Sequence, residues 1–350
     1  MTEGPTIVFS CNDISKARKT MKKGVMRMLG LGLLLGVGFE GIAAMKSSWP
    51  RTVVKDVRPD LLNDDRAVFS LPTDLAAYGG KIYVVDARDG VIRVYSGDGD
   101  YLREIGKPGQ GPGEFDFPHA VDFYDETIYV ADSSNKRIQI LSLDGRYLSG
   151  FRLMESPEQL IVLDQDTIVV SHWPDDSKGK ENIIRCYDRR GKLLWEALDI
   201  ALTSDRVLDT LINQMTMLKT QDGGFSVVKK NNDRCLYHYG KTGTLLGKTE
   251  VDLRFAPKKV VLPLSGGPRT MSCFFWTAAF GEGRFYLVVP DNMEDGDIGP
   301  GREVLAVDKD GRVLEVLVLP VSVKKFLPEE GRFYAVDTDN VLRVFEAGRK

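Results

Sequence analysis

A segment of 20 residues recurs along this chain with its residues in register. Residues 83–102 read YVVDARDGVIRVYSGDGDYL and residues 129–148 read YVADSSNKRIQILSLDGRYL, so the two align without a gap at an offset of 46. Shorter copies follow as CYDRRGKLL, HYGKTGTLL and AVDKDGRVL, and FEAGRK ends the chain. One copy cannot bury its hydrophobic faces alone, so the copies must stack on one another. The glycines that mark them are Gly99, Gly145, Gly191, Gly243, Gly311 and Gly348, separated by 46, 46, 52, 68 and 37 residues.

Each copy has the pattern of short antiparallel strands. Apolar and β-branched residues alternate, and dipeptides such as Asp-Gly supply the positive φ of tight hairpin turns. Repetition of such units every 40 to 50 residues is typical of β-propeller blades. We therefore predict an all-β fold at residues 51–350, a six-bladed β-propeller of four-stranded antiparallel blades. The last copy holds only three strands, so residues 51–57, RTVVKDV, are predicted to complete it as an N-terminal closing strand that hides two sheet edges.

The first 44 residues have the layout of a secretory signal. Six lysines and arginines precede the apolar run MLGLGLLLGVGF at residues 28–39, and small residues follow it. The run is shorter than the roughly 20 apolar residues of a bilayer-spanning helix, which favours cleavage over anchoring. We predict a signal peptide or N-terminal signal anchor at residues 1–44, beginning at Met1 or Met21. The protein is then exported, periplasmic or extracellular, and meets a membrane only through an uncleaved leader.

The composition of the remaining chain limits its partners and its cross-links. The formal net charge is -3, of which the leader carries +3, leaving residues 45–350 at -6. A mildly acidic protein has no general attraction for phosphate backbones, so nucleic acid is not expected as a partner. Three cysteines lie outside the leader, an odd number. We predict no disulfide framework for Cys186, Cys235 and Cys273, and buried thiols for Cys186 and Cys235, which lie in strand-like segments.

A glycine-rich segment carries a resemblance to known proteins. Residues 106–115 read GKPGQGPGEF and lead through DFPHAVDF into the copy YVADSSNKRIQILSLDG. This stretch resembles the NHL-repeat six-bladed propellers and the exported bacterial propellers related to them. The resemblance implies a TolB-like ring of six blades, a fold used mostly for binding and occasionally for lyase or lactonase chemistry. Fold likeness does not transfer an activity, so function must be argued from the site.

Two features that could be mistaken for ligand sites have structural interpretations. GKPGQGPGEF lacks the Gly-Lys-Ser/Thr ending and the following helix of a phosphate-binding loop, so we predict a crossing between blades. Asp86, Asp132 and Asp337 each follow a strand at matching positions in the repeat. We predict that these three carboxylates cap turns, because one carboxylate at each loop start is a feature of the repeat.

The resemblance also implies where a ligand would bind. In such propellers the residues that begin each innermost strand, and the loops between second and third strands, surround the mouth of a central channel on one face. The longest departures from the repeat fall there, at residues 171–182, 201–214, 256–270 and 290–301. Loops on a rigid scaffold often carry binding groups. The predicted ligand-binding residues of this mouth and rim are Thr73, Arg88, His119, Arg137, Glu158, Trp173, Asn213 and Arg234, with Thr270 and Lys324 as looser matches.

We expect a non-catalytic protein that binds a partner protein, a peptide or a carbohydrate on this face without a cofactor. The alternative is a lyase or lactonase-type enzyme with one divalent metal at the channel mouth. Of the three histidines, only His119 falls at the mouth, which disfavours a three-histidine zinc site. Oxygen ligands would come from Glu158 and Asn213. No residue is assigned a catalytic or metal-binding role, and the identity of the ligand and the oligomeric state stay open.

Overall fold

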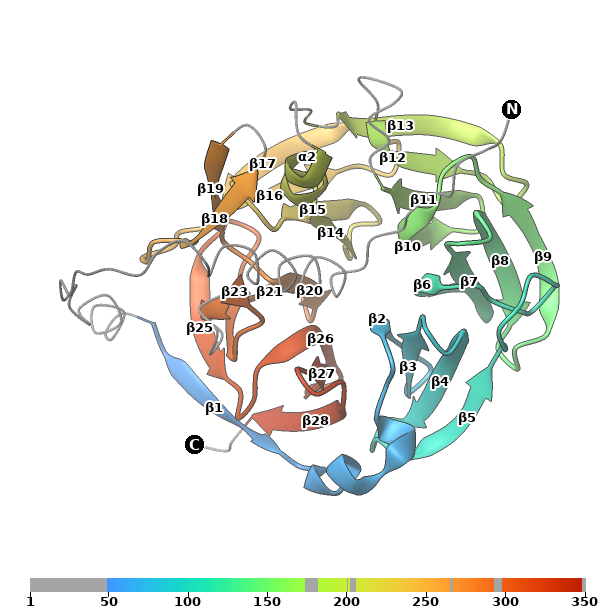
Figure 1. Ribbon diagram of the computed structural model, residues 1–350, viewed down its shortest axis with the longest axis horizontal. Coiled ribbons are helices and arrows are strands. Elements are labelled where there is room, and N and C mark those ends of the chain that lie inside the picture. Colours follow the sequence, from blue (N-terminus) through green and yellow to red (C-terminus); the bar gives the residue numbers. More distant parts are fainter. Residues whose placement is uncertain are drawn as a thin grey trace, which may run out of the picture. The chain divides into compact units, whose positions relative to one another are not determined.

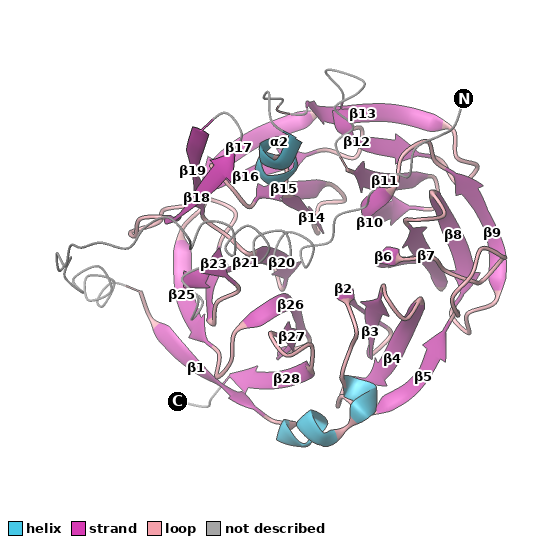
Figure 2. Cartoon of the chain, viewed as in Figure 1, coloured by secondary structure: helices cyan, strands magenta, loops and turns pink. Residues whose placement is uncertain are grey.

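Each copy of the repeat folds into an antiparallel sheet, because its strands are short and its turns contain glycine. The computed structural model describes residues 49–173, 182–199, 201, 206–264, 267–292 and 298–347. All of them belong to the unit formed by residues 48–350, whereas the predicted leader and Gly348 lie outside the described residues. Figure 1 shows the sheets following one another around a ring, and Figure 2 shows that the described elements are nearly all strands.

The first four blades are four-stranded antiparallel sheets made of consecutive strands, as predicted. Blade 1 contains β2 (Pro72–Tyr78), β3 (Lys81–Asp86), β4 (Val91–Ser96) and β5 (Tyr101–Ile105). Blade 2 contains β6 (Pro118–Tyr124), β7 (Thr127–Asp132), β8 (Arg137–Ser142) and β9 (Tyr147–Arg152). Blade 3 contains β10 (Pro157–Asp164), β11 (Thr167–His172), β12 (Asn182–Tyr187) and β13 (Leu193–Asp199). Blade 4 contains β14 (Met215–Lys219), β15 (Phe225–Lys229), β16 (Cys235–Tyr239) and β17 (Leu245–Glu250).

The N-terminal strand joins the last two blades. Blade 5 contains β20 (Thr277–Gly281), β21 (Arg284–Val288), β24 (Glu303–Val307) and β25 (Val313–Val318), and blade 6 contains β26 (Val323–Glu329), β27 (Arg332–Asp337) and β28 (Leu342–Ala347). β1 (Arg51–Asp56) supplies the fourth strand of blade 6 by pairing antiparallel with β28, which confirms the predicted closing strand. The beginning of β1 also pairs parallel with β25 of blade 5. One strand therefore protects the edges of two sheets.

Additional elements interrupt the repeat between blades 3 and 5. They are α2 (Arg206–Ile212), the hairpin of β18 (Lys258–Leu264) and β19 (Gly267–Cys273), and the small hairpin of β22 (Asp291–Asn292) and β23 (Ile298–Gly299). The long spacing between Gly243 and Gly311 thus contains the last strand of blade 4, most of blade 5 and two extra hairpins. Two short 3₁₀ helices, Pro59–Asn63 and Asp65–Ala67, connect β1 to blade 1. Within the described residues, no helix has the length and hydropathy needed to cross a membrane.

The hydrophobic core is divided among the contacts between blades. Six buried clusters lie between successive blades, and the cluster between blades 6 and 1 closes the ring. Between blades 1 and 2, for example, the ring of Phe123 stacks on Tyr78 with centroids 4.9 Å apart and lies 4.5 Å from Tyr83. Each sheet is therefore covered on both faces only because it has a neighbour. Cys186, Cys235 and Cys273 are buried free thiols, and burial was predicted for the first two.

The five marker glycines within the described residues, Gly99, Gly145, Gly191, Gly243 and Gly311, occupy the hairpin between the third and fourth strands of blades 1 to 5. Gly243 shows why the position requires glycine, because its φ is +76° and an added Cβ would lie 2.4 Å from Cε3 of Trp195 in blade 3. The turn of one blade thus packs directly on the outer strand of the preceding blade. The repeat spacing that is visible in the sequence reflects this contact between blades.

The three repeated aspartates cap backbone turns, as predicted. Asp86 is fully buried and accepts hydrogen bonds from the backbone N–H groups of Ser70 and Leu71, at 2.8 and 2.9 Å. Asp132 accepts the equivalent bond from the N–H of Asp116, whereas Asp337 accepts from the N–H groups of Asp339 and Val341 in the turn that follows it. Asp132 and Asp337 each also pair with an arginine of the same blade. Each carboxylate therefore fixes the chain that leads into or out of its strand.

The glycine-rich segment is a structural crossing between blades 1 and 2, as predicted. Arg137 of β8 donates hydrogen bonds to the backbone carbonyl oxygens of Gln110, Gly111 and Glu114, at 2.8, 2.9 and 2.9 Å. The side chain of Gln139 bonds both to the N–H of Gly113 and to the carbonyl oxygen of Glu114. These contacts leave the guanidinium of Arg137 engaged with the crossing.

Candidate functional site

A β-bulge begins the innermost strand in four of the six blades. In β2, β6, β10 and β26 the first and third residues pair with the second strand of the blade, and the residue between them is skipped. The skipped residues are Thr73, His119, Glu158 and Lys324. The sequence alignment placed all four at one repeat position, and the structure gives them one backbone environment.

Two of the four bulge residues contact the next blade around the ring through their side chains. Thr73 Oγ1 donates to the carbonyl oxygen of Pro118 at 3.2 Å, and His119 Nδ1 lies 2.9 Å from the carbonyl oxygen of Glu158. A carbonyl oxygen only accepts, so Nδ1 of His119 carries the proton in this contact. In the neutral ring Nε2 is then an acceptor. Among the described residues, none donates a hydrogen bond to Nε2.

The surroundings of His119 keep its imidazole neutral. Burial lowers the pKa of His119 to about 4, and the positive charges of Lys325 and Lys230 act in the same direction. The contact with the Glu158 carbonyl oxygen opposes them. The ring of Trp173 meets His119 edge to face, with centroids 6.1 Å apart. His119 is therefore an acceptor beside an aromatic ring at neutral pH.

Glu158 lies in the same surroundings. Burial raises the pKa of its carboxyl group, and the charges of Lys230 and Lys325 lower it. Protein atoms surround most of its side chain, but part of the side chain remains in contact with solvent. No residue of the described chain donates a hydrogen bond to this carboxylate. We call His119, Glu158, Trp173, Lys230 and Lys325 the mouth cluster.

The loop that carries Lys230 is held rigidly. The N–H of Lys230 donates to the carbonyl oxygen of Gln214 at 3.0 Å, and its own carbonyl oxygen accepts from Phe274 at 3.1 Å. Asn231 Nδ2 donates to the carbonyl oxygen of Leu211 in α2, at 2.8 Å. Asn232 N–H bonds to the carbonyl oxygen of Ser272 in β19, at 2.7 Å. One short loop thus anchors two of the inserted elements and also places Lys230 in the mouth cluster.

Farther along the inner strands, polar side chains join neighbouring blades. Asp74 accepts from the N–H of Val121 at 3.0 Å, and Asp122 accepts from the N–H of Val162 at 2.6 Å. Lys219 of blade 4 pairs with Asp122 at 3.0 Å. The side-chain amide of Gln159 both donates to and accepts from the backbone of β14, at Met215 and Met217. These groups are engaged within the protein, in contrast to Glu158 and to Nε2 of His119.

Three other predicted residues lie away from the mouth cluster. Arg88 is exposed on the loop between β3 and β4. Asn213 is buried and donates to the carbonyl oxygen of Asp209 at 2.7 Å, so it holds the insertion before β14. Arg234 forms an ion pair with Glu250. Ligand contacts by these residues, and by Arg137, stay predictions. Thr270 lies in β19, paired with Val261, and not at the beginning of an inner strand.

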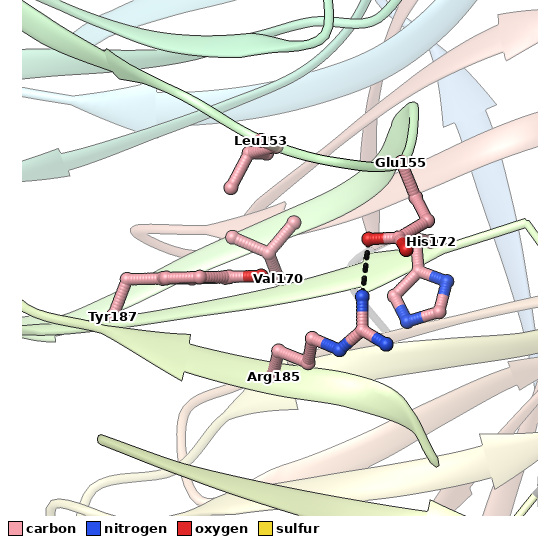
Figure 3. A pocket seen from close by; sticks show the side chains of 6 residues that line it. All are labelled: Leu153, Glu155, Val170, His172, Arg185 and Tyr187. Carbon is pink, nitrogen blue, oxygen red and sulfur yellow. Dashed lines mark hydrogen bonds and ion pairs between the residues drawn. The ribbon is translucent and has the colours of Figure 1, made fainter. Parts of the chain in front are cut away.

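A small pocket lies beside blade 3, lined by Leu153, Glu155, Val170, His172, Arg185 and Tyr187. Figure 3 shows the ion pair between Glu155 and Arg185 beside His172. His172 occupies the position of the capping aspartates and bonds through Nε2 to the carbonyl oxygen of Asn182, at 2.9 Å. Arg185 also pairs with Glu196 at 2.7 Å. The polar groups shown here serve the blade itself.

Comparison with known families agrees with this geometry. Residues 61–259 match the model of a family described as 6-bladed beta-propeller. The chain belongs to this six-bladed propeller family. No curated protein matches it significantly.

Solved structures share the propeller fold at low sequence identity. A protein from Bacteroides fragilis NCTC 9343, provisionally named as exported, has a TM-score of 0.54 and 11% identity, covering 82% of this chain and 93% of its own. The virginiamycin B lyase of Staphylococcus aureus has a TM-score of 0.45 and 8% identity, covering 85% of this chain and 88% of its own. At these identities the likeness concerns the fold alone.

Two members of the mouth cluster in this six-bladed propeller were not among the predicted ligand-binding residues. Lys230 follows β15 at the repeat position that Trp173 occupies after β11, so the alignment offered a signal for it. Lys325 is adjacent to Lys324 and directly follows the bulge of β26. In the part of the chain that the structure describes, no three His, Cys, Asp or Glu side chains are grouped so that they could hold a metal ion.

Proposed function

We propose that this propeller is an exported binding protein that takes up a partner protein, a peptide or a carbohydrate on its loop-rich face, without catalysis. The mouth cluster is the centre of the proposed site. One observation carries the proposal: the Glu158 carboxylate and Nε2 of His119, on the neighbouring inner strands β10 and β6 and both half-buried, receive no hydrogen bond from any described residue. Both groups keep contact with solvent, so a ligand that displaces water from them can supply hydrogen-bond donors.

The framework around the cluster supports a binding role. The bulges on β6 and β10 fix the backbone of His119 and Glu158, and the anchored loop fixes Lys230. A binding group that is held in place loses little conformational entropy when the ligand arrives. The inserted elements that this loop anchors, α2 and β19, add surface beside the cluster.

Export is part of the proposal and is supported by the leader. A run of lysines and arginines followed by twelve apolar residues is the layout of a secretory signal. The structural neighbour from Bacteroides fragilis is provisionally named as exported. We also propose that the chain is related to the NHL-repeat and TolB-like propellers, on the strength of residues 106–115.

Thermal unfolding in the presence of ligands tests the proposal, because a ligand that binds only the folded state raises its stability. We expect the unfolding temperature of the full chain to rise with neutral oligosaccharides or with a library of random peptides. The rise should be lost in Glu158→Gln and retained in Lys81→Gln, since Lys81 is exposed at the opposite rim.

Metal analysis of the same preparations separates binding from the enzyme alternative. Stoichiometric metal that is lost in both His119→Ala and Glu158→Ala would replace the proposal with a metal-dependent lyase or lactonase. No rise with either ligand class would also overturn it.

A further inference from the structure

We infer that the mouth cluster binds a neutral carbohydrate, whose hydroxyl groups bond to Glu158, His119 and Lys230 and whose apolar face packs on Trp173. This inference rests on the proposed function and narrows its ligand to one chemical class. Binding of a peptide or of a partner protein instead is an alternative result that the test distinguishes.

The hydrogen-bonding groups of the cluster call for a ligand that both donates and accepts. The Glu158 carboxylate and Nε2 of His119 are acceptors, whereas the ammonium of Lys230 is a donor without an acceptor. Among the described residues, no carboxylate lies within ion-pair distance of Lys230. A hydroxyl group donates one hydrogen bond and accepts others. Neighbouring hydroxyls of one sugar can therefore satisfy all three side chains.

The charges of the cluster favour a neutral ligand. Lys230 and Lys325 act together on His119 and lower its pKa, so a cationic ligand would meet their repulsion. An anionic ligand would meet the repulsion of the Glu158 carboxylate, to which no described residue donates a hydrogen bond. A neutral ligand meets neither repulsion, and the comparison with uronic-acid oligosaccharides tests whether the second lysine gives an anion the advantage.

Trp173 supplies the surface that a sugar ring requires. The face of an indole ring carries partial negative charge and attracts the weakly positive C–H groups of a sugar. Trp173 is half-buried, and its edge-to-face contact with His119 at 6.1 Å fixes it beside the polar groups. An apolar face next to fixed polar groups is the arrangement of small-molecule sites.

A protein interface is less consistent with the exposed apolar residues. Stable protein interfaces contain a core of apolar anchors. Apart from Leu62, the exposed leucines lie on the outer strands of the blades, and Met154, between β9 and β10, is the exposed apolar residue nearest in sequence to Glu158. Five of them repeat at one position of the fourth strand, namely Leu102, Leu148, Leu194, Leu246 and Leu314. Trp173, which belongs to the mouth cluster, is the aromatic residue that we predicted to contact a ligand.

Calorimetric titration with neutral hexasaccharides of glucose, mannose, galactose or xylose tests the inference on the full chain. We expect at least one to bind, with affinity reduced at least about tenfold by Glu158→Gln, which removes a charge-assisted hydrogen bond. Trp173→Ala should weaken binding about fivefold, while Trp173→Phe should retain most of it, because phenylalanine keeps an aromatic face. Lys81→Gln is the matched control and should bind like the wild type.

Stability provides a second measurement. Glu158→Gln removes a buried charge that no described donor satisfies, so its unfolding temperature should equal or exceed that of the wild type while binding falls. Loss of binding together with loss of folding would count against the inference.

The competing outcomes are distinct. Binding of random peptides that depends on Glu158, without binding of any hexasaccharide, overturns the carbohydrate inference and leaves the proposed function standing. Hexasaccharide binding that is unaffected by Glu158→Gln and Trp173→Ala overturns the site. Uronic-acid oligosaccharides that bind more tightly than neutral ones overturn the neutrality argument. Absence of binding by every probe overturns the inference and the proposed function together.

Discussion

The protonation of His119 has a measurable consequence for stability. The imidazole has a pKa of about 4 in the folded protein, because it is buried and lies near Lys325 and Lys230, against 6.5 in the unfolded chain. Between these values the unfolded chain binds a proton that the folded protein does not. The free energy of unfolding therefore falls as the pH falls from 6.5 towards 4, and this contribution to stability is complete only above pH 6.5.

The perturbation that isolates this effect is His119→Gln, whose amide can still donate to the Glu158 carbonyl oxygen. One pH unit corresponds to about 1.4 kcal/mol, so the interval from 6.5 to about 4 amounts to about 3 kcal/mol at most. The wild type should lose this amount relative to the variant as the medium is acidified. Burial raises the pKa of Glu158 and of Asp74, and these groups act in the opposite direction. Both remain in the variant, so the comparison removes most of their contribution.

Urea denaturation of both proteins at intervals from about pH 7.5 to about pH 4, followed by tryptophan fluorescence, measures the difference. A difference in unfolding free energy that stays constant over this range would refute the argument, because His119 would then titrate alike in both states. A wild type that gains stability on acidification relative to the variant would show that the imidazole is charged in the folded protein. That result would also remove the acceptor on which the proposed site depends.

Three further predictions concern the ring. Val54→Asp should lower the free energy of unfolding by more than about 3 kcal/mol in urea denaturation, because it buries an unpaired carboxylate in the closing strand; an unchanged midpoint would show that β1 is dispensable. Gly243→Ala should cost about 1–3 kcal/mol more than Gly223→Ala, since both have positive φ but only the first meets a neighbour, Trp195; equal urea midpoints would contradict this. Thiol reagents at about pH 8 should react slowly with Cys186, Cys235 and Cys273 in the native protein of a Cys11→Ser variant, because burial raises their thiol pKa values well above 9. Urea unfolding should make the reaction rapid, and fast reaction of the native variant would contradict this.

The architecture was predictable because the contacts between blades leave a mark in the sequence. Gly243 must be glycine where its turn packs on Trp195, and Gly145, Gly191 and Gly311 likewise meet atoms of the preceding blade, so the spacing of these glycines follows the contacts between blades. The missing fourth strand of the last copy likewise pointed to residues 51–57. The parallel pairing of β1 with β25 was not predicted, since the count of strands required only one partner for the closing strand.

The site was predictable only where the repeat is regular. The bulge positions of blades 1, 2, 3 and 6 align in sequence, and the structure confirms that they are equivalent. Blade 4 has no such bulge, because Met215 and Thr216 pair consecutively with Lys229 and Val228. Asn213 was assigned to a position that this blade lacks. The inserted hairpin of β18 and β19 displaced the assignment of Thr270 in the same way.

The bulge also explains why Lys325 was missed. In a regular strand, neighbouring residues point to opposite faces, so sequence reasoning takes one residue of each pair as facing the ring axis. A bulge sets two residues of one strand against one of its partner and interrupts this alternation. Blade 1 shows the result, since Thr73 and Asp74 are adjacent and both contact β6 of the next blade. The bulge of β26 likewise lets Lys325, the neighbour of Lys324, lower the pKa of His119. The electrostatics of the mouth cluster thus depend on a backbone irregularity that the alternation of side chains in the sequence does not reveal.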